Sequence, residues 1–182
     1  AAVVITAGFS ESRDAAGLKR TEAMLKAAQP SRLRIVGPNC LGIQAPASGL
    51  NASFAHVDAL PGSLAFVTQS GAIITAVLDW AAERKIGFSH VVSLGDMSDV
   101  DFGDMLDWLA IDPNTSAILL YIEAIRDARK FMSAARAAAR TKPVIVVKAG
   151  RSAAAQRAAL SHTGAMAGSD AVYDAAFRRA GM

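Results

Sequence analysis

The chain has 182 residues, of which 52% are apolar and 6% aromatic, with a formal net charge of +3. This length allows a buried core in one or two domains. Its basic residues are dispersed, which argues against a nucleic-acid interface and suits a phosphate-rich small ligand instead. No run of about 18 apolar residues predicts a membrane span. The single cysteine, Cys40, excludes a disulfide framework and a thiolate metal site, and indicates the reducing cytoplasm.

Short apolar runs alternate with helical patterns along the chain, which begins without Met and is expected to be part of a longer protein. The stretch 42–62 is rich in Gly, Pro, Ser and Asn and is interpreted as an irregular crossing between domains. The alternation predicts an α/β fold of doubly wound parallel sheets with helices on both faces. Strands are predicted over 2–7, 33–36, 64–68, 88–94, 118–122 and 144–147, and helices over 17–29, 72–83, 102–110, 127–140 and 170–179.

Ligands of open parallel sheets bind at the carboxyl ends of the strands, so these ends supply the candidate residues. The run Thr68-Gln69-Ser70-Gly71-Ala72 leads a strand directly into a helix. The free N–H groups of the first helical turn suit a phosphate beside the Ser70 hydroxyl. Equally, Ser70 is a plain N-cap and Gly71 only relieves crowding. No Walker-type Lys follows, so this is not a P-loop.

Two further candidates carry acid–base or nucleophilic side chains. His162 lies in Ser161-His162-Thr163-Gly164-Ala165 beyond the last strand, and its imidazole is suited to carrying a group covalently. The alternative is a merely solvated loop histidine. Glu123 ends an apolar strand, where it either orients a histidine through Nδ1–H or is the first solvated residue of a loop.

Asn39 and Cys40 follow the rigid Gly37-Pro38 turn, so we expect both to be exposed or to line a cleft. Nothing nearby marks Cys40 as a nucleophile. An acidic cluster lacks the Gly and the terminal Glu of an EF-hand loop, which favours helix capping at Asp99 or Asp101 over calcium binding. We expect no metal site and interpret the other two histidines as structural. The acidic cluster is Asp96, Asp99, Asp101 and Asp104, and these histidines are His56 and His90.

Four strand-end motifs, in this order and spacing, resemble the nucleoside-diphosphate-forming acyl-CoA synthetases. This family includes the ADP-forming acetyl-CoA synthetases and the α subunit of succinyl-CoA synthetase. The loop Gly95-Asp96-Met97-Ser98-Asp99-Val100-Asp101 resembles the acetyl-CoA synthetase branch, which usually carries Asn where Asp96 stands. The four motifs are Gly37-Pro38-Asn39-Cys40-Leu41-Gly42, Ser70-Gly71, Tyr121-Ile122-Glu123 and Ser161-His162-Thr163-Gly164-Ala165.

The resemblance implies that residues 1–58 are the C-terminal part of a CoA-binding Rossmann-like domain. Residues 59–182 would form a flavodoxin-like domain of succinyl-CoA synthetase type with a phosphohistidine loop. The implied reaction interconverts acyl-CoA, ADP and phosphate with acid, CoA and ATP, through an acyl phosphate and a phosphohistidine. ADP or ATP and Mg²⁺ would bind an ATP-grasp domain or subunit outside this chain, so the isolated chain is expected to be inactive.

The resemblance also assigns roles to single residues. His162 would carry the phosphoryl group and Glu123 would orient it, while Ser70 and Gly71 would hold the phosphate. Asn39 and Cys40 would lie near CoA and its acyl group.

The alternative is a non-catalytic, acyl-CoA-sensing region of a protein lysine acetyltransferase, as in a bacterial branch of the family fused to an acetyltransferase domain. Retention of His162, Glu123 and Ser70 favours chemistry. The Ala/Arg-rich composition and Asp96 resemble the fused branch. The sequence does not identify the acyl group, the choice between ADP and GDP, or an oligomeric state.

Overall fold

The computed structural model describes residues 1–150 and 170–182, which form two sheets and the helices around them. A short parallel pair joins β1 (Ala2–Val3) to β2 (Ile35–Val36). The predicted strand over 2–7 is longer than β1, because β2 ends at Val36, before Gly37-Pro38, and leaves no partner for a longer regular ladder. Single backbone bonds continue the pairing, from Val4 N–H to Val36 O and from Asn39 N–H to Thr6 O.

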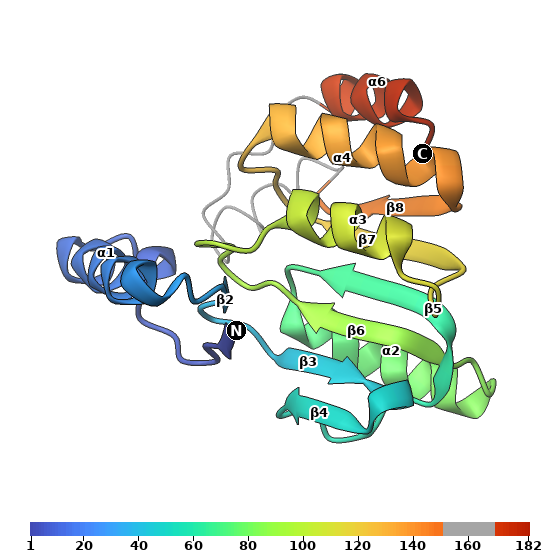
Figure 1. Cartoon of the computed structure of the whole chain (residues 1–182), viewed down its shortest axis with the longest axis horizontal. Coiled ribbons are helices and arrows are strands. Elements are labelled where there is room, and N and C mark those ends of the chain that lie inside the picture. The colour runs from blue at the N-terminus through green and yellow to red at the C-terminus, as the bar shows by residue number, and fades with distance from the viewer. Residues whose placement is uncertain (151–169) are drawn as a thin grey trace.

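The larger sheet has six strands (Figure 1). They are β3 (Gly42–Ala45), β4 (Leu50–Ser53), β5 (Pro61–Thr68), β6 (Phe88–Ser93), β7 (Ala117–Ile122) and β8 (Val144–Lys148), in the order β4-β3-β6-β5-β7-β8. Strands β5 to β8 run parallel, and β5 lies between β6 and β7. Its residues Ala65 to Val67 are buried on both faces, which explains their uninterrupted apolar sequence. The predicted parallel-rich α/β sheet is confirmed.

The expectation of an irregular crossing over 42–62 is wrong for residues 42–53. β3 pairs antiparallel with both β4 and β6 and so extends the sheet at one edge. The hairpin escapes a periodicity test because its buried face carries Gln44, whose side chain bonds Ala59 N–H, Val57 O and Ser53 Oγ. The assignment of residues 1–58 to the end of a CoA-binding domain stays a prediction.

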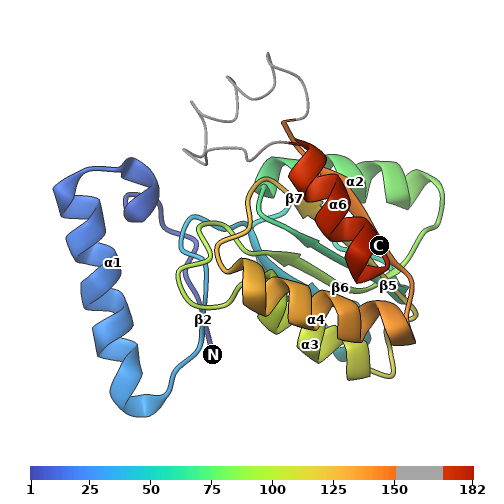
Figure 2. The ribbon, with the colours of Figure 1, turned by 90° about the horizontal axis from the view of Figure 1, so that it is seen from above.

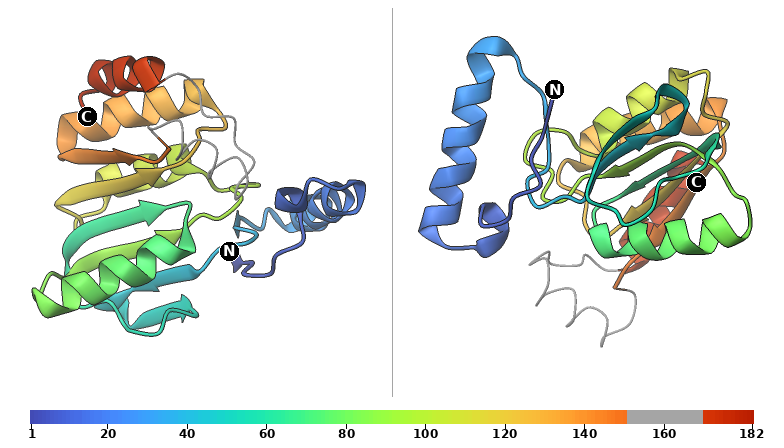
Figure 3. Two further views of the ribbon diagram at one scale, coloured as in Figure 1. Left: turned by 180° about the vertical axis from the view of Figure 1, so that it is seen from behind. Right: turned by 90° about the horizontal axis from the view of Figure 1, so that it is seen from below.

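Helices cover both faces of the six-stranded sheet (Figures 2 and 3). One face carries α2 (Gly71–Glu83), and the other carries α3 (Phe102–Ile111) and α4 (Ala128–Thr141), with α6 (Asp170–Ala180) packed on α4. Helix α1 (Ala15–Ala28) projects away from this sheet. One-turn 3₁₀ helices occupy Ser10–Ser12, Gln29–Ser31 and Pro46–Ser48.

The apolar pattern of each helix explains which side it buries. α4 carries its buried residues on one face at helical spacing, while arginines occupy the opposite side. None of the helices in the described ranges is long and apolar enough to cross a membrane. The buried face of α4 consists of Phe131, Ala134, Ala135 and Ala138.

Candidate functional site

The carboxyl ends of β5, β6 and β7 meet at one edge of the sheet. Thr68 is in register with Ser93 on one side and with Tyr121 on the other. The segments that follow these three residues therefore leave the sheet side by side, as the sequence predicts for a parallel sheet. This edge brings together most of the predicted site residues.

Ser70 begins helix α2 but does not cap it with its side chain. It occupies the N-cap position, yet among the described residues its hydroxyl accepts no capping bond from the first helical turn. The Ser70 N–H donates instead to Thr68 Oγ1 at 2.9 Å. The N-terminus of α2 thus presents backbone N–H groups beside a half-buried hydroxyl, which is the arrangement that suits an oxyanion.

Gly71 brings the start of α2 close to the Gly37–Gly42 segment. A Cβ at Gly71 would lie 3.1 Å from Leu41 Cβ, so the predicted relief of crowding is real. Leu41 N–H in turn donates to Ser93 Oγ at the end of β6, at 2.9 Å. The start of α2, the end of β6 and this turn therefore pack as one unit.

Glu123 follows β7 directly, and its backbone is held by Gln69, for which the sequence suggested no role. Gln69 Oε1 accepts the N–H groups of Glu123 and Ala124, at 2.8 and 2.9 Å. Glu123 is half-buried. Burial, and the nearby Glu123 carboxylate, raise the pKa of Tyr121. The carboxylate is thus placed at the same edge as the start of α2.

The turn after β2 exposes Asn39 and buries Cys40. Asn39 adopts a left-handed backbone with φ of 54° and is exposed. The expectation that Cys40 is exposed or lines a cleft is wrong, because it is 3% exposed and its thiol donates to Val4 O at 3.3 Å. This burial raises the pKa of the Cys40 thiol. Cys40 is therefore a buried support of the turn. Contact of Asn39 and Cys40 with CoA stays a prediction.

Asp96, in the loop after β6, is held by protein groups on three sides. Its N–H donates to Pro38 O at 2.9 Å. Its carboxylate accepts the Ser10 hydroxyl and lies 3.8 Å from the Arg126 guanidinium. The loop after β6 is therefore bound to the turn after β2, to the N-terminal segment and to the loop after β7. Sequence reasoning missed Ser10 and Arg126, which lie far from Asp96 along the chain.

The remaining carboxylates of the acidic cluster serve helix α3 and two basic side chains. Asp101 and Asp104 form a capping box, so the predicted cap at Asp101 is confirmed. Asp104 also contacts Arg34 at 3.2 Å and Lys130 at 2.5 Å. Asp99 accepts Ile35 N–H at 2.7 Å, so it joins β2 to this cluster instead of capping α3. In residues 1–150 and 170–182, no three His, Cys, Asp or Glu side chains are grouped to hold a metal ion.

The two histidines interpreted as structural lie outside these strand-end segments. His56 pairs with Asp79 at 2.7 Å. His90, within β6, meets the Trp108 ring edge-on with 4.6 Å between centroids. Burial lowers the pKa of His90, although Asp112 nearby opposes the shift.

His162 lies outside the described residues, so its distance from Glu123 stays a prediction. What the structure does describe is the approach to it. β8 ends at Lys148, and the following N–H of Ala149 donates to Ile122 O at 2.9 Å. The chain therefore leaves β8 beside the end of β7, at the edge that holds Glu123.

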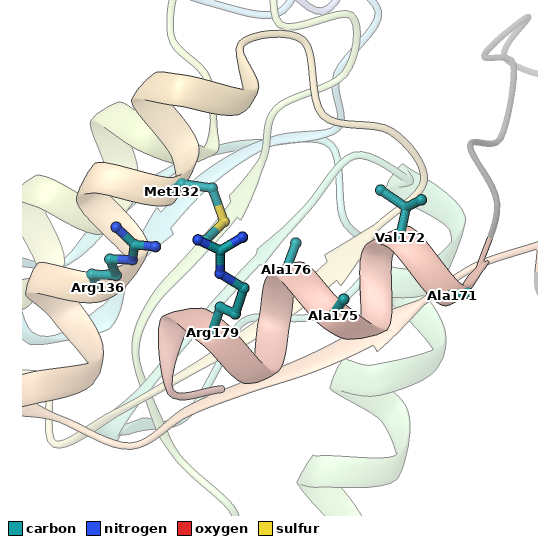
Figure 4. Close-up of a pocket in the computed structure, with 7 residues that line it drawn as sticks. All are labelled: Met132, Arg136, Ala171, Val172, Ala175, Ala176 and Arg179. Atoms are coloured by element: carbon teal, nitrogen blue, oxygen red, sulfur yellow. The ribbon is translucent and has the colours of Figure 1, made fainter.

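A separate groove of about 450 Å³ lies between α4 and α6 (Figure 4). Met132, Val172 and three alanines form its apolar lining, with Arg136 and Arg179 at its sides. All its lining residues come from these two helices, so the groove is distinct from the strand-end site.

The chain is similar in sequence to known CoA ligases. The family model described as "succinyl-CoA ligase like flavodoxin domain" matches residues 61–182. An ADP-forming acetate–CoA ligase of Archaeoglobus fulgidus is 46% identical over 181 residues, which are 100% of this chain and 26% of that protein. The α subunit of an ADP-forming acetate–CoA ligase of Pyrococcus furiosus is 44% identical over 98% of this chain and 38% of that subunit.

A solved structure has the same fold over nearly the whole chain. It is an acetyl-coenzyme A synthetase of Candidatus Korarchaeum cryptofilum, described as dinucleotide-forming and determined in complex with phosphate and ADP. The TM-score is 0.90 at 40% identity, over 99% of this chain and 39% of that one. This chain therefore spans between about a quarter and two fifths of these relatives, at 26%, 38% and 39%.

Proposed function

Because the chain belongs to the family of succinyl-CoA ligase like flavodoxin domains, we propose that it is the phosphoryl-carrying part of an ADP-forming acyl-CoA synthetase. The observation that carries this proposal is the strand-end edge of the sheet. There the N-terminus of α2, with Ser70 and Gly71, lies beside the segment that holds Glu123. An oxyanion site and a carboxylate at one edge are the parts that a phosphohistidine step requires.

The proposed reaction has three steps. Phosphate attacks the acyl carbon of acyl-CoA, which releases CoA and leaves an acyl phosphate. The phosphoryl group then passes to His162 and releases the acid, and His162 finally gives it to ADP. Phosphoryl transfer depends mainly on positioning and on neutralising charge, and the amides at the start of α2 would do both for the phosphate. Glu123 would hold the imidazole in the required tautomer.

CoA is proposed to approach the turn that carries Asn39. This side chain is exposed, and the turn packs on both the start of α2 and the loop after β6. A thioester held at Asn39 would therefore lie next to the proposed phosphate site. Cys40 lies beneath the turn and would act by supporting it.

The nucleotide is proposed to bind on an ATP-grasp domain or subunit, which would also hold Mg²⁺. The P. furiosus relative is named as a subunit α, which supports a partner subunit for this chain. We propose a cytoplasmic location because the single cysteine of this chain is a free thiol. The isolated chain would then carry no ligase activity.

The experiment measures ATP formation from acetyl-CoA, ADP and phosphate by the protein that carries this chain together with its nucleotide-binding partner. We expect activity in the wild type, none with His162→Ala, and none from residues 1–182 alone. Equal activity of wild type and His162→Ala would overturn the proposal. An inactive wild type that instead acetylates protein lysines would establish the regulatory alternative.

A further inference from the structure

The Gln69 side chain continues the hydrogen bonding between β5 and β7 beyond the last paired residues of the two strands. The last residues paired by the two strands are Thr68 and Tyr121. Beyond them, Gln69 Oε1 accepts two backbone N–H groups, from Glu123 at 2.8 Å and from Ala124 at 2.9 Å. The side-chain amide thus replaces a backbone carbonyl where the regular strand has ended.

These two bonds fix the backbone from which the Glu123 side chain projects. A carbonyl oxygen has two lone pairs, and here both serve adjacent N–H groups. On the other side of β7, Ile122 O accepts the Ala149 N–H at 2.9 Å. The end of β7 is therefore hydrogen-bonded on both sides, to the segment after β5 and to the segment after β8. On the β5 side, Gln69 fixes the backbone from which the Glu123 carboxylate leaves the sheet.

Gln69 also directly precedes Ser70, the residue at the start of α2. Gln69 is thus adjacent in sequence to the proposed phosphate site. Its side chain also binds the backbone of Glu123, whose carboxylate is the proposed orienting group. We propose that Gln69 is a positioning residue that holds Glu123 at a fixed place relative to the N-terminus of α2. This inference rests on the proposed function, because it takes Glu123 as the group that orients His162.

Gln44 offers a matched control. Its Oε1 also accepts a backbone N–H, that of Ala59 at 2.6 Å, and Gln44 is 2% exposed. It lies on β3, away from the segments that follow β5 and β7. Replacing either glutamine with Met keeps the length of the side chain and removes the acceptor oxygen, but only Gln69→Met acts on Glu123.

The experiment measures steady-state acyl-CoA synthesis from ATP, acid and CoA, together with phosphorylation of His162, in the protein that carries this chain with its nucleotide-binding partner. We expect Gln69→Met to lower kcat by about 10- to 100-fold, since small displacements of positioned groups have effects of this size. KM for ATP should stay unchanged, because the nucleotide site is elsewhere. Gln44→Met should lower thermal stability and leave kcat as in the wild type.

Hydrogen exchange supplies a second measurement. The Glu123 and Ala124 amides should exchange faster in Gln69→Met, and their protection should return in Gln69→Glu, which keeps an acceptor oxygen. A phosphorylated wild type with equal kcat in Gln69→Met and Gln44→Met would overturn the positioning role and leave the proposed function intact. A wild type that is never phosphorylated on His162 would overturn the proposed function, and the role of Gln69 with it.

Discussion

Gly95 lies against the backbone of Asn39. A Cβ built on Gly95 would come 2.5 Å from the Asn39 carbonyl oxygen and 2.2 Å from that of Pro38. Gly95 also has a φ of 55°, in the left-handed region that favours glycine. The loop after β6 and the turn that presents Asn39 are therefore fitted backbone to backbone, and a side chain at Gly95 would separate them.

Gly95→Ala is expected to destabilise the protein and to displace the Asn39 turn. The substitution adds left-handed strain and a contact with backbone atoms that cannot move aside alone, so we expect a loss of about 2 kcal/mol or more. Denaturant unfolding measures it. The matched control is Gly49→Ala, where φ is 68° but, among the described residues, only the chain neighbours of Gly49 come within 4 Å of the added Cβ. Its cost should be only about 1 kcal/mol, and equal losses for the two variants would contradict the close fit.

Ser70→Ala is expected to change stability by less than about 0.5 kcal/mol, since no capping bond is lost among the contacts that the structure describes. Asp127→Ala is the control, because Asp127 Oδ1 does cap its helix by accepting Arg129 and Lys130 N–H groups at 3.0 and 2.9 Å. That change should cost about 1 kcal/mol. Thermal or denaturant unfolding separates the two, and a loss at Ser70 as large as that at Asp127 would favour the plain capping role.

Cys40 is expected to resist thiol reagents in the folded protein. Its burial raises the pKa of the thiol and keeps reagents away, so the reactive thiolate is scarce. Cys40 is the single cysteine of the chain, so mass spectrometry after treatment with iodoacetamide reports it alone. We expect modification only after unfolding in denaturant. Rapid labelling of the folded protein would mean that the turn opens and that Cys40 is available to a ligand.

Asp104 is expected to make stability depend on pH in the acid range. Burial alone would raise its pKa, but hydrogen bonds from Lys130, from the Asp101 N–H and from Arg34 lower the pKa to about 2, from an ordinary value of 3.8. The carboxylate therefore stabilises the fold above the ordinary pKa, and this contribution is lost as the pH falls from about 4 to about 2.

Asp104→Asn tests this contribution by urea unfolding at several pH values. The partners of Asp104 are partly exposed, so the free energy of unfolding of the wild type should exceed that of the variant by about 1 kcal/mol at neutral pH. The difference should stay constant down to pH of about 5 and shrink toward pH 2. A difference that is the same at pH 2 and pH 6 would exclude the ion pairs as its source.

Local sequence patterns predicted most of the fold because its inner strands, such as β5 and β6, are largely buried on both faces. Runs such as 64–67 and 118–122 are continuously apolar, and the helices between them carry one apolar face. The hairpin of β3 and β4 was missed because its buried face carries a polar residue, Gln44, whose partners include residues outside the hairpin. Gln44 is polar in sequence yet buried in the structure, where its bonds to Ala59 and Val57 offset its burial.

In the candidate site, too, local patterns identified some residues, whereas residues held by contacts distant in sequence were missed. The sequence placed Ser70, Gly71 and Glu123 at strand ends, and the parallel sheet brings these ends to one edge. Gln69 and Arg126 could not be identified, because their partners Glu123 and Asp96 adjoin them only through the register of the sheet. The prediction for Cys40 failed because a turn residue was taken as exposed. In the structure its thiol is covered by the carbonyls of Val4, directly after β1, and of Val36, at the end of β2.

His162 is proposed to carry a phosphoryl group during the reaction. The direct measurement is mass spectrometry, under neutral conditions, of the complete protein and its nucleotide-binding partner after incubation with ATP and Mg²⁺. The result predicted is an acid-labile phosphate on the peptide that contains His162, absent in His162→Asn and strongly reduced in Glu123→Gln. Phosphate found on another residue, or none on His162 while acyl-CoA is still formed, would contradict the claim.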